Sequence, residues 1–282
     1  MPLLKAQRFA DGFIFLESPK WQHDHLWVSD VFDHRVYAIS PKGERRVACL
    51  VPHRPSGLGF LPDGSLIIVS SKERKLLRLV NGQITETYAD LYDHAASDVN
   101  DFAVDDRGRI YVGNFGYDYD AGEARRPTSL HRIDPDGTIT EVAKGVEFPN
   151  GSVVIHGGRT LIVAETWACR LTAFDLGIDG ELTNRRVFAD MGHRQPDGIC
   201  ADAEGAVWVG CFNTGEFVRV LDGGRVTHWF EFQGCGVSCT LGGADGRQLF
   251  LSTYLGASES IAAGARLGAL FTATVDVPAI GS

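Results

Sequence analysis

Short runs of aliphatic, β-branched and aromatic residues recur along the chain, each about five residues long and bounded by Gly, Asp and Asn. This pattern is typical of β-strands, and no amphipathic helix of three turns is evident. The clearest six runs are Leu26–Ser29, Leu66–Val69, Ile110–Gly113, Leu161–Ala164, Val207–Gly210 and Leu249–Ser252. Their reference residues Trp27, Ile67, Tyr111, Ile162, Trp208 and Phe250 lie 40, 44, 51, 46 and 42 residues apart.

Each repeat has the internal order of one propeller blade. A first short strand ends in a tight turn such as Pro62-Asp63-Gly64, the reference run follows, and two further strands complete the repeat. Periods of 40 to 51 residues with four strands per period are typical of β-propellers. The sequence therefore predicts an all-β fold: a six-bladed β-propeller with four antiparallel strands per blade, formed by residues 1–282 as a single domain.

The two ends of the chain predict how the ring closes. Phe9-Ala10-Asp11 resembles Tyr88-Ala89-Asp90 and Phe188-Ala189-Asp190, which end outer strands, whereas the last repeat ends with a third strand over Ala269–Val275. We therefore expect the N-terminal strand, from Ala6 to Phe9, to pair with the last repeat and complete blade six. This pairing would leave no exposed sheet edge at the junction.

Polar or small residues recur 10 to 12 residues ahead of the reference residues. They are Glu17, Gly57, Asn100, Asn150, Asp197 and Ser238. The first strand of a blade lines the central channel, so we expect these positions to meet at one mouth. Glu17, Asn100, Asn150 and Asp197 would form a cage of hard oxygen donors. Such a cage favours one divalent ion, Ca²⁺ first, with Mg²⁺, Mn²⁺ and Zn²⁺ as alternatives.

A simpler interpretation competes at two of these positions. Asn150-Gly151 and Asp197-Gly198 are dipeptides that also occur in turns. A turn does not account for Glu17 or Asn100, which have no following glycine. The common register of all four donors therefore favours the metal site.

Composition narrows the classes of function. A net charge of −9 argues against a nucleic-acid surface, and no apolar run is long enough to cross a membrane. The N-terminus lacks the pattern of a secretory signal, so we expect a cytoplasmic protein. The six cysteines form no Cys-x-x-Cys pair, and most of them are expected to be buried apolar residues in strands. The oligomeric state is left open.

Other candidate groups are fewer. There is no Gly-x-Ser-x-Gly nucleophile elbow. We expect His23-Asp24-His25 to be a solvated turn, and His94 and His193 to lie in loops near the mouth as accessory groups without an identified partner. Aromatic residues follow second strands or flank first strands, and they either face the mouth or pack between blades: Phe115, Tyr117, Phe148, Trp167, Phe212 and Tyr254.

With this predicted fold and ring of oxygen donors, the chain resembles the SMP-30/gluconolactonase/luciferin-regenerating-enzyme family of six-bladed propellers. The resemblance covers essentially the whole chain and rests on an ordered set of short segments. These are Leu16-Glu17-Ser18-Pro19-Lys20-Trp21, Val99-Asn100-Asp101-Phe102-Ala103-Val104-Asp105, Phe148-Pro149-Asn150-Gly151, Gln195-Pro196-Asp197-Gly198, Val237-Ser238-Cys239-Thr240-Leu241-Gly242-Gly243 and Gly268-Ala269-Leu270-Phe271.

The resemblance implies that Glu17, Asn150 and Asp197 ligate one divalent ion and that Asn100 lies beside it and holds substrate. It implies lactone hydrolysis with Asp197 as the catalytic carboxylate. Sugar-lactone members tend to carry Arg where this chain has Asp98. That departure, with Phe115, Tyr117 and Trp167 as expected substrate-binding residues, favours a flatter and less polar lactone or ester.

We therefore expect a metal-dependent hydrolase that acts on a small lactone or similar cyclic or aryl ester, with Asp197 as base on water. Two alternatives stay open. The same site could serve phosphotriester hydrolysis or a non-hydrolytic lyase or isomerase reaction, because fold does not determine reaction. A calcium-stabilised binding propeller without catalytic activity is the other.

Overall fold

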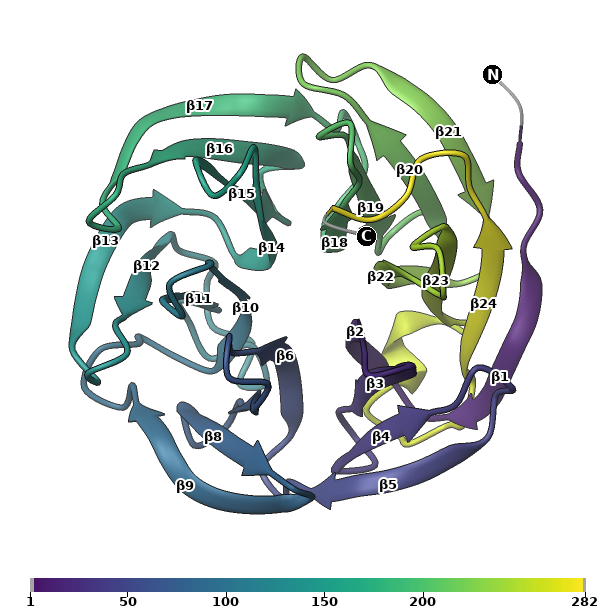
Figure 1. Ribbon diagram of the computed structural model, residues 1–282, viewed down its shortest axis with the longest axis horizontal. Helices are drawn as coiled ribbons and strands as arrows, with labels where there is room; N and C mark the ends of the chain where they lie inside the picture. The colour runs from purple at the N-terminus through teal and green to yellow at the C-terminus, as the bar shows by residue number, and fades with distance from the viewer. Residues whose placement is uncertain (1–2, 281–282) are drawn as a thin grey trace.

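Six four-stranded antiparallel sheets surround a central axis in the computed structural model, which describes residues 3–280 (Figure 1). Blade 1 contains β2 (Leu16–Gln22), β3 (His25–Asp30), β4 (Arg35–Ile39) and β5 (Arg45–Leu50). Blade 2 contains β6 (Pro55–Phe60), β7 (Leu66–Ser70), β8 (Lys75–Val80) and β9 (Gln83–Asp90). Blade 3 contains β10 (Val99–Val104), β11 (Ile110–Asn114), β12 (Thr128–Ile133) and β13 (Ile139–Val146).

The second half of the ring repeats this order. Blade 4 contains β14 (Pro149–Ile155), β15 (Thr160–Glu165), β16 (Arg170–Leu176) and β17 (Leu182–Asp190). Blade 5 contains β18 (Pro196–Ala201), β19 (Val207–Cys211), β20 (Glu216–Val220) and β21 (Val226–Glu231). Blade 6 contains β22 (Cys235–Gly242), β23 (Gln248–Tyr254), β24 (Gly268–Thr274) and the N-terminal β1 (Gln7–Phe13), and a short 3-10 helix, η1 (Ser258–Ser260), lies in the loop before β24. The predicted fold, including its six blades, is confirmed.

The N-terminal strand closes the ring as the sequence predicts. β1 pairs antiparallel with β24 on the outside of blade 6, and it extends to Phe13, four residues beyond the predicted end. The ring of Phe9 lies 5.2 Å from that of Phe250, and Phe13 is fully buried. Closure therefore joins the two ends of the chain through both a hydrogen-bonded ladder and an apolar contact.

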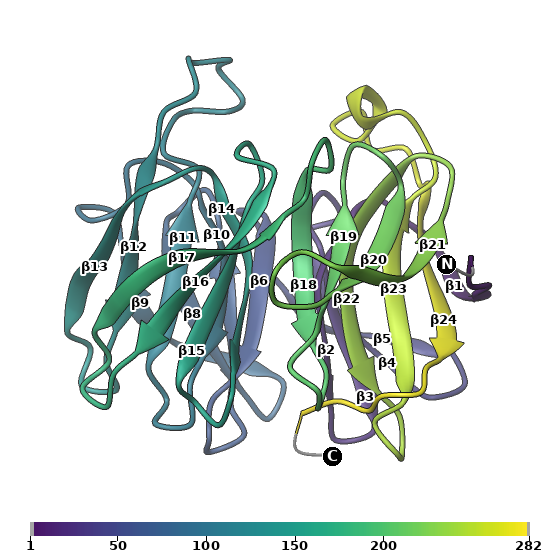
Figure 2. The ribbon, with the colours of Figure 1, turned by 90° about the horizontal axis from the view of Figure 1, so that it is seen from above.

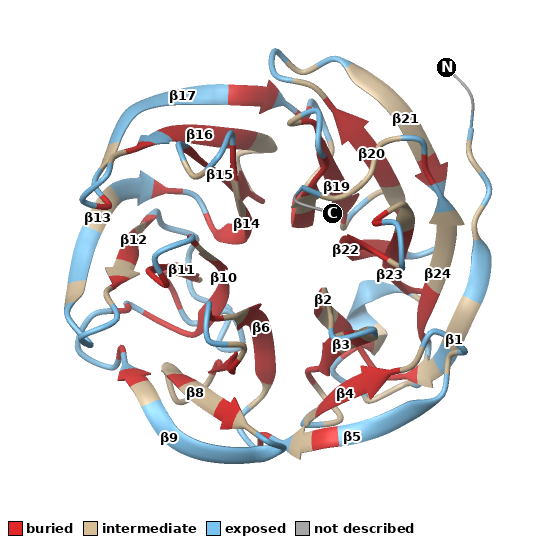
Figure 3. Ribbon diagram, viewed as in Figure 1, coloured by how far each residue is buried: buried red, intermediate tan, exposed pale blue. Residues whose placement is uncertain are grey.

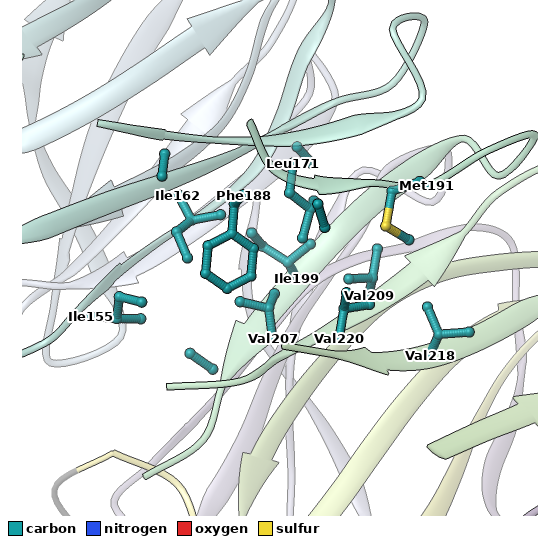
Figure 4. Close-up of a cluster of buried hydrophobic side chains, with 14 of the residues drawn as sticks. Ile155, Ile162, Leu171, Phe188, Met191, Ile199, Val207, Val209, Val218 and Val220 are labelled. Carbon is teal, nitrogen blue, oxygen red and sulfur yellow. The ribbon is translucent and has the colours of Figure 1, made fainter. Parts of the chain in front are cut away.

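Burial falls from the axis to the rim of the propeller (Figure 3). All residues of β7 are buried, whereas β9 on the outside of the same blade is mostly exposed. Neighbouring blades pack through apolar side chains, as between blades 4 and 5, where Phe188 lies among Ile162, Ile199 and Val207 (Figure 4). Strands covered on both faces read as continuous apolar runs, which explains the strong signal of the second strands.

The first strand of every blade carries an irregularity at the same place. The ladder to the second strand shifts register after Glu17 in β2, Val99 in β10, Pro149 in β14 and Pro196 in β18, and β6 and β22 have equivalent shifts. An irregular register turns a strand and re-aims its side chains, and such features are common beside active sites. In β2, β10, β14 and β18 the irregular segment contains or directly adjoins one of the predicted oxygen donors.

The glycines that follow two of the donors serve close packing rather than turns. Gly151 lies within β14 and Gly198 within β18, and neither adopts a left-handed φ. A Cβ on Gly151 would lie 2.5 Å from the backbone nitrogen of Ile199, and one on Gly198 would lie 2.7 Å from the Cα of Ser238. The turn interpretation of these dipeptides is therefore wrong, because each glycine allows two first strands to approach closely.

Within residues 3–280, no helix has the length and apolar character needed to cross a membrane.

Candidate active site

A cavity of about 370 Å³ opens at the end of the channel where the first strands begin. Two long loops rise on this side of the ring, residues 115–127 between β11 and β12 and residues 255–267 between β23 and β24 (Figure 2). Both contribute to the walls, through Phe115, Tyr119 and Asp120 from the first loop and Ser258, Glu259 and Ile261 from the second. The volume lies within the range typical of small-molecule sites.

Four predicted donors meet at this cavity. Glu17 on β2, Asn100 on β10, Asn150 on β14 and Asp197 on β18 all line it, and their strands ring the axis in Figure 1. They come from four different blades, across 180 residues of sequence. The structure therefore brings together the whole set that the sequence repeat singles out.

The two amides are held by hydrogen bonds between neighbouring blades. Asn100 donates from Nδ2 to the Pro149 carbonyl at 3.2 Å, and Asn150 donates from Nδ2 to Thr166 Oγ1 at 3.3 Å. Thr166 in turn donates to the Pro196 carbonyl at 2.8 Å. With each amide nitrogen engaged by the protein, the amide oxygen is the group left to bind a ligand.

Among the four donors, Asp197 is the one with a buried oxygen that accepts no hydrogen bond from the described residues. Its side chain is 4% exposed, and Oδ1 is buried without a hydrogen-bond partner among the residues that the structure describes. Burial raises the pKa of Asp197 well above its ordinary value, and the charge of Asp101 raises it further. Burial likewise raises the pKa of Glu17, followed by the charges of Asp197 and Asp101. A bound cation would relieve both the desolvation and the repulsion, so the donor set fits a divalent metal ion.

A third carboxylate next to the pair was not predicted. Asp101 is buried, and its Oδ1 accepts hydrogen bonds from Ser18 Oγ at 3.0 Å and from the Phe102 amide at 2.9 Å. Strict strand alternation places neighbours on opposite faces, so Asn100 and Asp101 would not be expected to serve one site. The register shift in β10 spans both residues. Asn100 lines the cavity, whereas Asp101 does not line it but lies close enough to Glu17 and Asp197 for its charge to raise the pKa of both.

The donor chemistry separates this site from the usual transition-metal clusters. Among residues 3–280, no three His, Cys, Asp or Glu side chains are grouped so that they could hold a metal ion. The cavity instead offers two carboxylates and two amide oxygens, the ligand types that Ca²⁺ and Mg²⁺ prefer. Waters and substrate would complete the coordination shell.

Asp98 lines the cavity but is engaged in a cluster of ion pairs at its rim. Lys72 Nζ lies 2.6 Å from Asp98 Oδ2 and 2.8 Å from Asp120 Oδ2, and Arg54 lies 2.7 Å from the same Asp120 oxygen. We call Arg54, Lys72, Asp98 and Asp120 the rim ion cluster. It ties the 115–127 loop to blade 2, and nothing in the sequence pattern indicated Arg54, Lys72 or Asp120.

Four of the six predicted mouth aromatics line the cavity, namely Phe115, Phe148, Trp167 and Phe212. Tyr117 is not among the lining residues: it is buried behind them, and its hydroxyl accepts a hydrogen bond from Trp167 Nε1 at 2.8 Å. Tyr254 is fully buried and bonds to Ser260. Tyr117 thus supports Trp167, the residue that reaches the cavity.

The histidines lie apart from the cavity. His23 and Asp24 form an exposed turn between β2 and β3, as predicted, and both have a positive φ. His25, predicted in the same turn, begins β3. Among the described residues that line the cavity, neither His94 nor His193 appears. The candidate acid-base groups at the floor are therefore the carboxylates.

Comparison with known proteins identifies the family of the chain. The SMP-30/gluconolactonase/LRE-like region matches residues 15–254. Regucalcin from Danio rerio is 28% identical over 92% of this chain and 90% of its own length. Pentonolactonase XacC from Haloferax volcanii is 28% identical over 94% of this chain and 91% of its own. The crystal structure of a putative gluconolactonase superposes with a TM-score of 0.81 at 22% identity, covering 99% of this chain and 94% of that one. The chain therefore belongs to the SMP-30/gluconolactonase/LRE-like family.

Proposed function

We propose that this protein is a divalent-metal-dependent hydrolase that opens a lactone at the floor of the cavity. Membership of a family with pentonolactonase and gluconolactonase members supports lactone hydrolysis as the class of reaction. The observation that carries the proposal is the buried Asp197 Oδ1, which has no partner among the described residues and lies in a pair of like charges with Glu17. Such a group is costly to maintain unless it serves binding or catalysis.

Glu17, Asn150 and Asp197 would hold the ion, with Ca²⁺ as the first candidate. A divalent cation bound there supplies Lewis-acid polarisation of the lactone carbonyl and stabilises the negative charge that develops on its oxygen. Asn100 lies beside this set and would orient the substrate, since its nitrogen is fixed on Pro149 and its oxygen is left to the cavity.

Asp197 would act as the general base. It would accept a proton from the attacking water as the water oxygen bonds to the carbonyl carbon. The ring carbon–oxygen bond then breaks, and the proton passes to the leaving ring oxygen, which gives a hydroxy acid. Burial raises the pKa of Asp197 in the metal-free protein. A bound cation would lower that pKa again, so Asp197 would regain its basicity only as substrate displaces part of its contact with the ion.

The test is the Asp197→Asn variant, which keeps the shape of the side chain and removes its charge and basicity. We expect it to fold, to lose lactone turnover by at least about 100-fold, and to lose most of the rise in melting temperature that Ca²⁺ gives the wild type. Asp190→Asn, an exposed position at the end of β17, is the matched control and should change neither quantity. Turnover is followed by acid release from lactones, with and without chelator, and full activity of Asp197→Asn would refute the assignment.

The same measurements separate the alternatives. Stabilisation by Ca²⁺ without turnover of lactones, aryl esters or phosphotriesters would identify a binding propeller. Turnover of a phosphotriester but no lactone would reassign the reaction while keeping the site.

A further inference from the structure

Two aromatic walls face the floor of the cavity. Phe115, Phe148 and Trp167 form the first wall: the Phe115 and Phe148 rings stack at 4.5 Å, and the Trp167 ring lies 5.0 Å from Phe148. Arg125 stacks on Trp167 at 3.7 Å. The first wall comes from blades 3 and 4.

The second wall comes from blades 1 and 5 and from the strand junction before blade 1. It consists of Phe15, Phe32 and Phe212, and the ring centroids of Phe32 and Phe212 lie 6.3 and 6.4 Å from that of Phe15. Val31 and Ile261 complete this apolar surface. A ligand in the cavity would therefore meet aromatic and aliphatic groups over most of its surface.

Four of the hydroxyl and indole donors that line the cavity are already used by the protein. Ser56 donates to the Asn100 carbonyl at 3.2 Å, Ser71 to the Val99 carbonyl at 2.7 Å, and Thr166 to the Pro196 carbonyl. The Trp167 nitrogen donates to Tyr117. A polyhydroxylated ring would bury hydroxyls against walls whose donors are committed, and each unpaired polar group costs about 1–3 kcal/mol in protein contexts.

Both cations at the rim are paired within the protein, whereas one carboxylate that lines the cavity is not. The two cations of the rim ion cluster, Arg54 and Lys72, are paired with Asp98 and Asp120. Glu259, which also lines the cavity, has no ion pair among the described residues. An anionic substrate would find no unpaired lining cation and would face the unpaired Glu259, so the rim disfavours an anion and accepts a neutral substrate.

The backbone at Phe148 supports a specific role for its ring. Phe148 has a φ of 53°, in the left-handed region that bulky residues rarely adopt, and it directly precedes Pro149 and Asn150. Such a conformation persists only where surrounding contacts impose it, and it is frequent at ligand sites. Here it places an aromatic ring on the wall, close along the chain to a predicted ligand of the metal.

From these observations we infer that the substrate is a neutral lactone fused to an aromatic ring, and not a polyhydroxylated sugar lactone. The reaction in this inference, lactone hydrolysis, rests on the proposed function. The kind of ligand is inferred from the two aromatic walls. The carbonyl would face Asp197, and the fused ring would lie between the two aromatic walls.

The experiment compares kcat/KM of the metal-loaded protein for 3,4-dihydrocoumarin, δ-valerolactone and D-glucono-1,5-lactone. We expect dihydrocoumarin to exceed gluconolactone by about 100-fold or more, because its fused ring packs against the aromatic walls and it buries no unpaired hydroxyl. Phe148→Leu and, independently, Phe115→Leu should lower kcat/KM for dihydrocoumarin by about 3- to 10-fold while leaving δ-valerolactone within about twofold. Phe60→Leu, at the opposite mouth of the channel, is the control and should alter none of the three.

Binding of the non-hydrolysable lactam 3,4-dihydro-2-quinolinone, measured by calorimetry, separates the ligand from the reaction. If gluconolactone is the better substrate, the inference is overturned and the proposed function stands. If no lactone is opened but the lactam binds and Phe148→Leu weakens it, the ligand class is supported and the proposed function fails. Absence of both turnover and lactam binding overturns the inference.

Discussion

Thr166 allows the construction of the site to be tested, because its hydroxyl forms a hydrogen bond with Asn150, a predicted metal ligand. Its hydroxyl accepts from Asn150 Nδ2 at 3.3 Å and donates to the Pro196 carbonyl at 2.8 Å, and its side chain is 4% exposed. Thr166→Val removes both hydrogen bonds with almost no change in shape. The terminal torsion of asparagine is soft, so the Asn150 amide would then rotate more freely.

The expected effect on metal binding can be estimated from this single lost anchor. Removing a group that orients a metal ligand typically weakens affinity by about 10- to 100-fold, which corresponds to about 1.4–2.7 kcal/mol. The metal-free protein should lose about 1–3 kcal/mol of stability, because both hydrogen bonds of the buried Thr166 hydroxyl are lost.

Thr160→Val is the matched control. Thr160 begins β15 at the end of the blade away from the cavity, is 7% exposed, and makes one weak hydroxyl contact with His156 at 3.4 Å. Calorimetric titration of Ca²⁺ into metal-stripped protein should show weaker binding for Thr166→Val and wild-type binding for Thr160→Val. If the two variants bind Ca²⁺ equally well, Thr166 does not hold a metal ligand and the assignment of Asn150 is wrong.

Two further predictions concern stability. Phe13→Ala should lower the free energy of unfolding by about 3–5 kcal/mol, since Phe13 is fully buried at the ring closure and Arg45 lies 4.6 Å above its ring; a loss below about 1 kcal/mol in urea unfolding would contradict that packing. Burial raises the pKa of Glu165, but hydrogen bonds, chiefly from Arg170, outweigh it and hold that pKa below its ordinary value of 4.5. Its ion pairs with Arg170 and Arg185 therefore stabilise the wild type fully above pH 4.5, the ordinary pKa of the carboxyl group. This stabilisation is lost as the pH falls through the lower pKa that Glu165 has in the folded protein. The gap in urea midpoint between wild type and Glu165→Gln should narrow as pH drops from 7 to 3, and a constant gap would refute the reasoning.

The fold was predictable because each of its signals is local and repeated. Strand runs, turn glycines and a period of 40 to 51 residues can be read without knowing what packs where. The likeness of Phe9-Ala10-Asp11 to two outer-strand endings was also enough to predict closure, which β1 confirms by pairing with β24. Only the extent of β1 was underestimated, since pairing along β24 carries it on to Phe13.

The candidate site was predictable only in part. Positions in register within a repeat meet at one mouth by the symmetry of the ring, so Glu17, Asn100, Asn150 and Asp197 could be grouped from the sequence. Asp101 could not, because alternation along a regular strand would separate it from its neighbour Asn100, and the irregularity of β10 between Val99 and Phe102 cannot be read from the sequence. The sequence also could not separate Trp167, which reaches the cavity, from Tyr117, which stands behind it.

The sequence by itself thus determined the six blades, their closure and the ring of oxygen donors, since periodicity and residue type are properties of the chain. The tertiary structure decided which side chains are aimed at the cavity, which donors are already engaged, and how the rim charges pair. The physical reason is that aim and pairing depend on contacts between segments far apart in the chain, as when Lys72 meets Asp120. Such contacts exist only after the ring has closed.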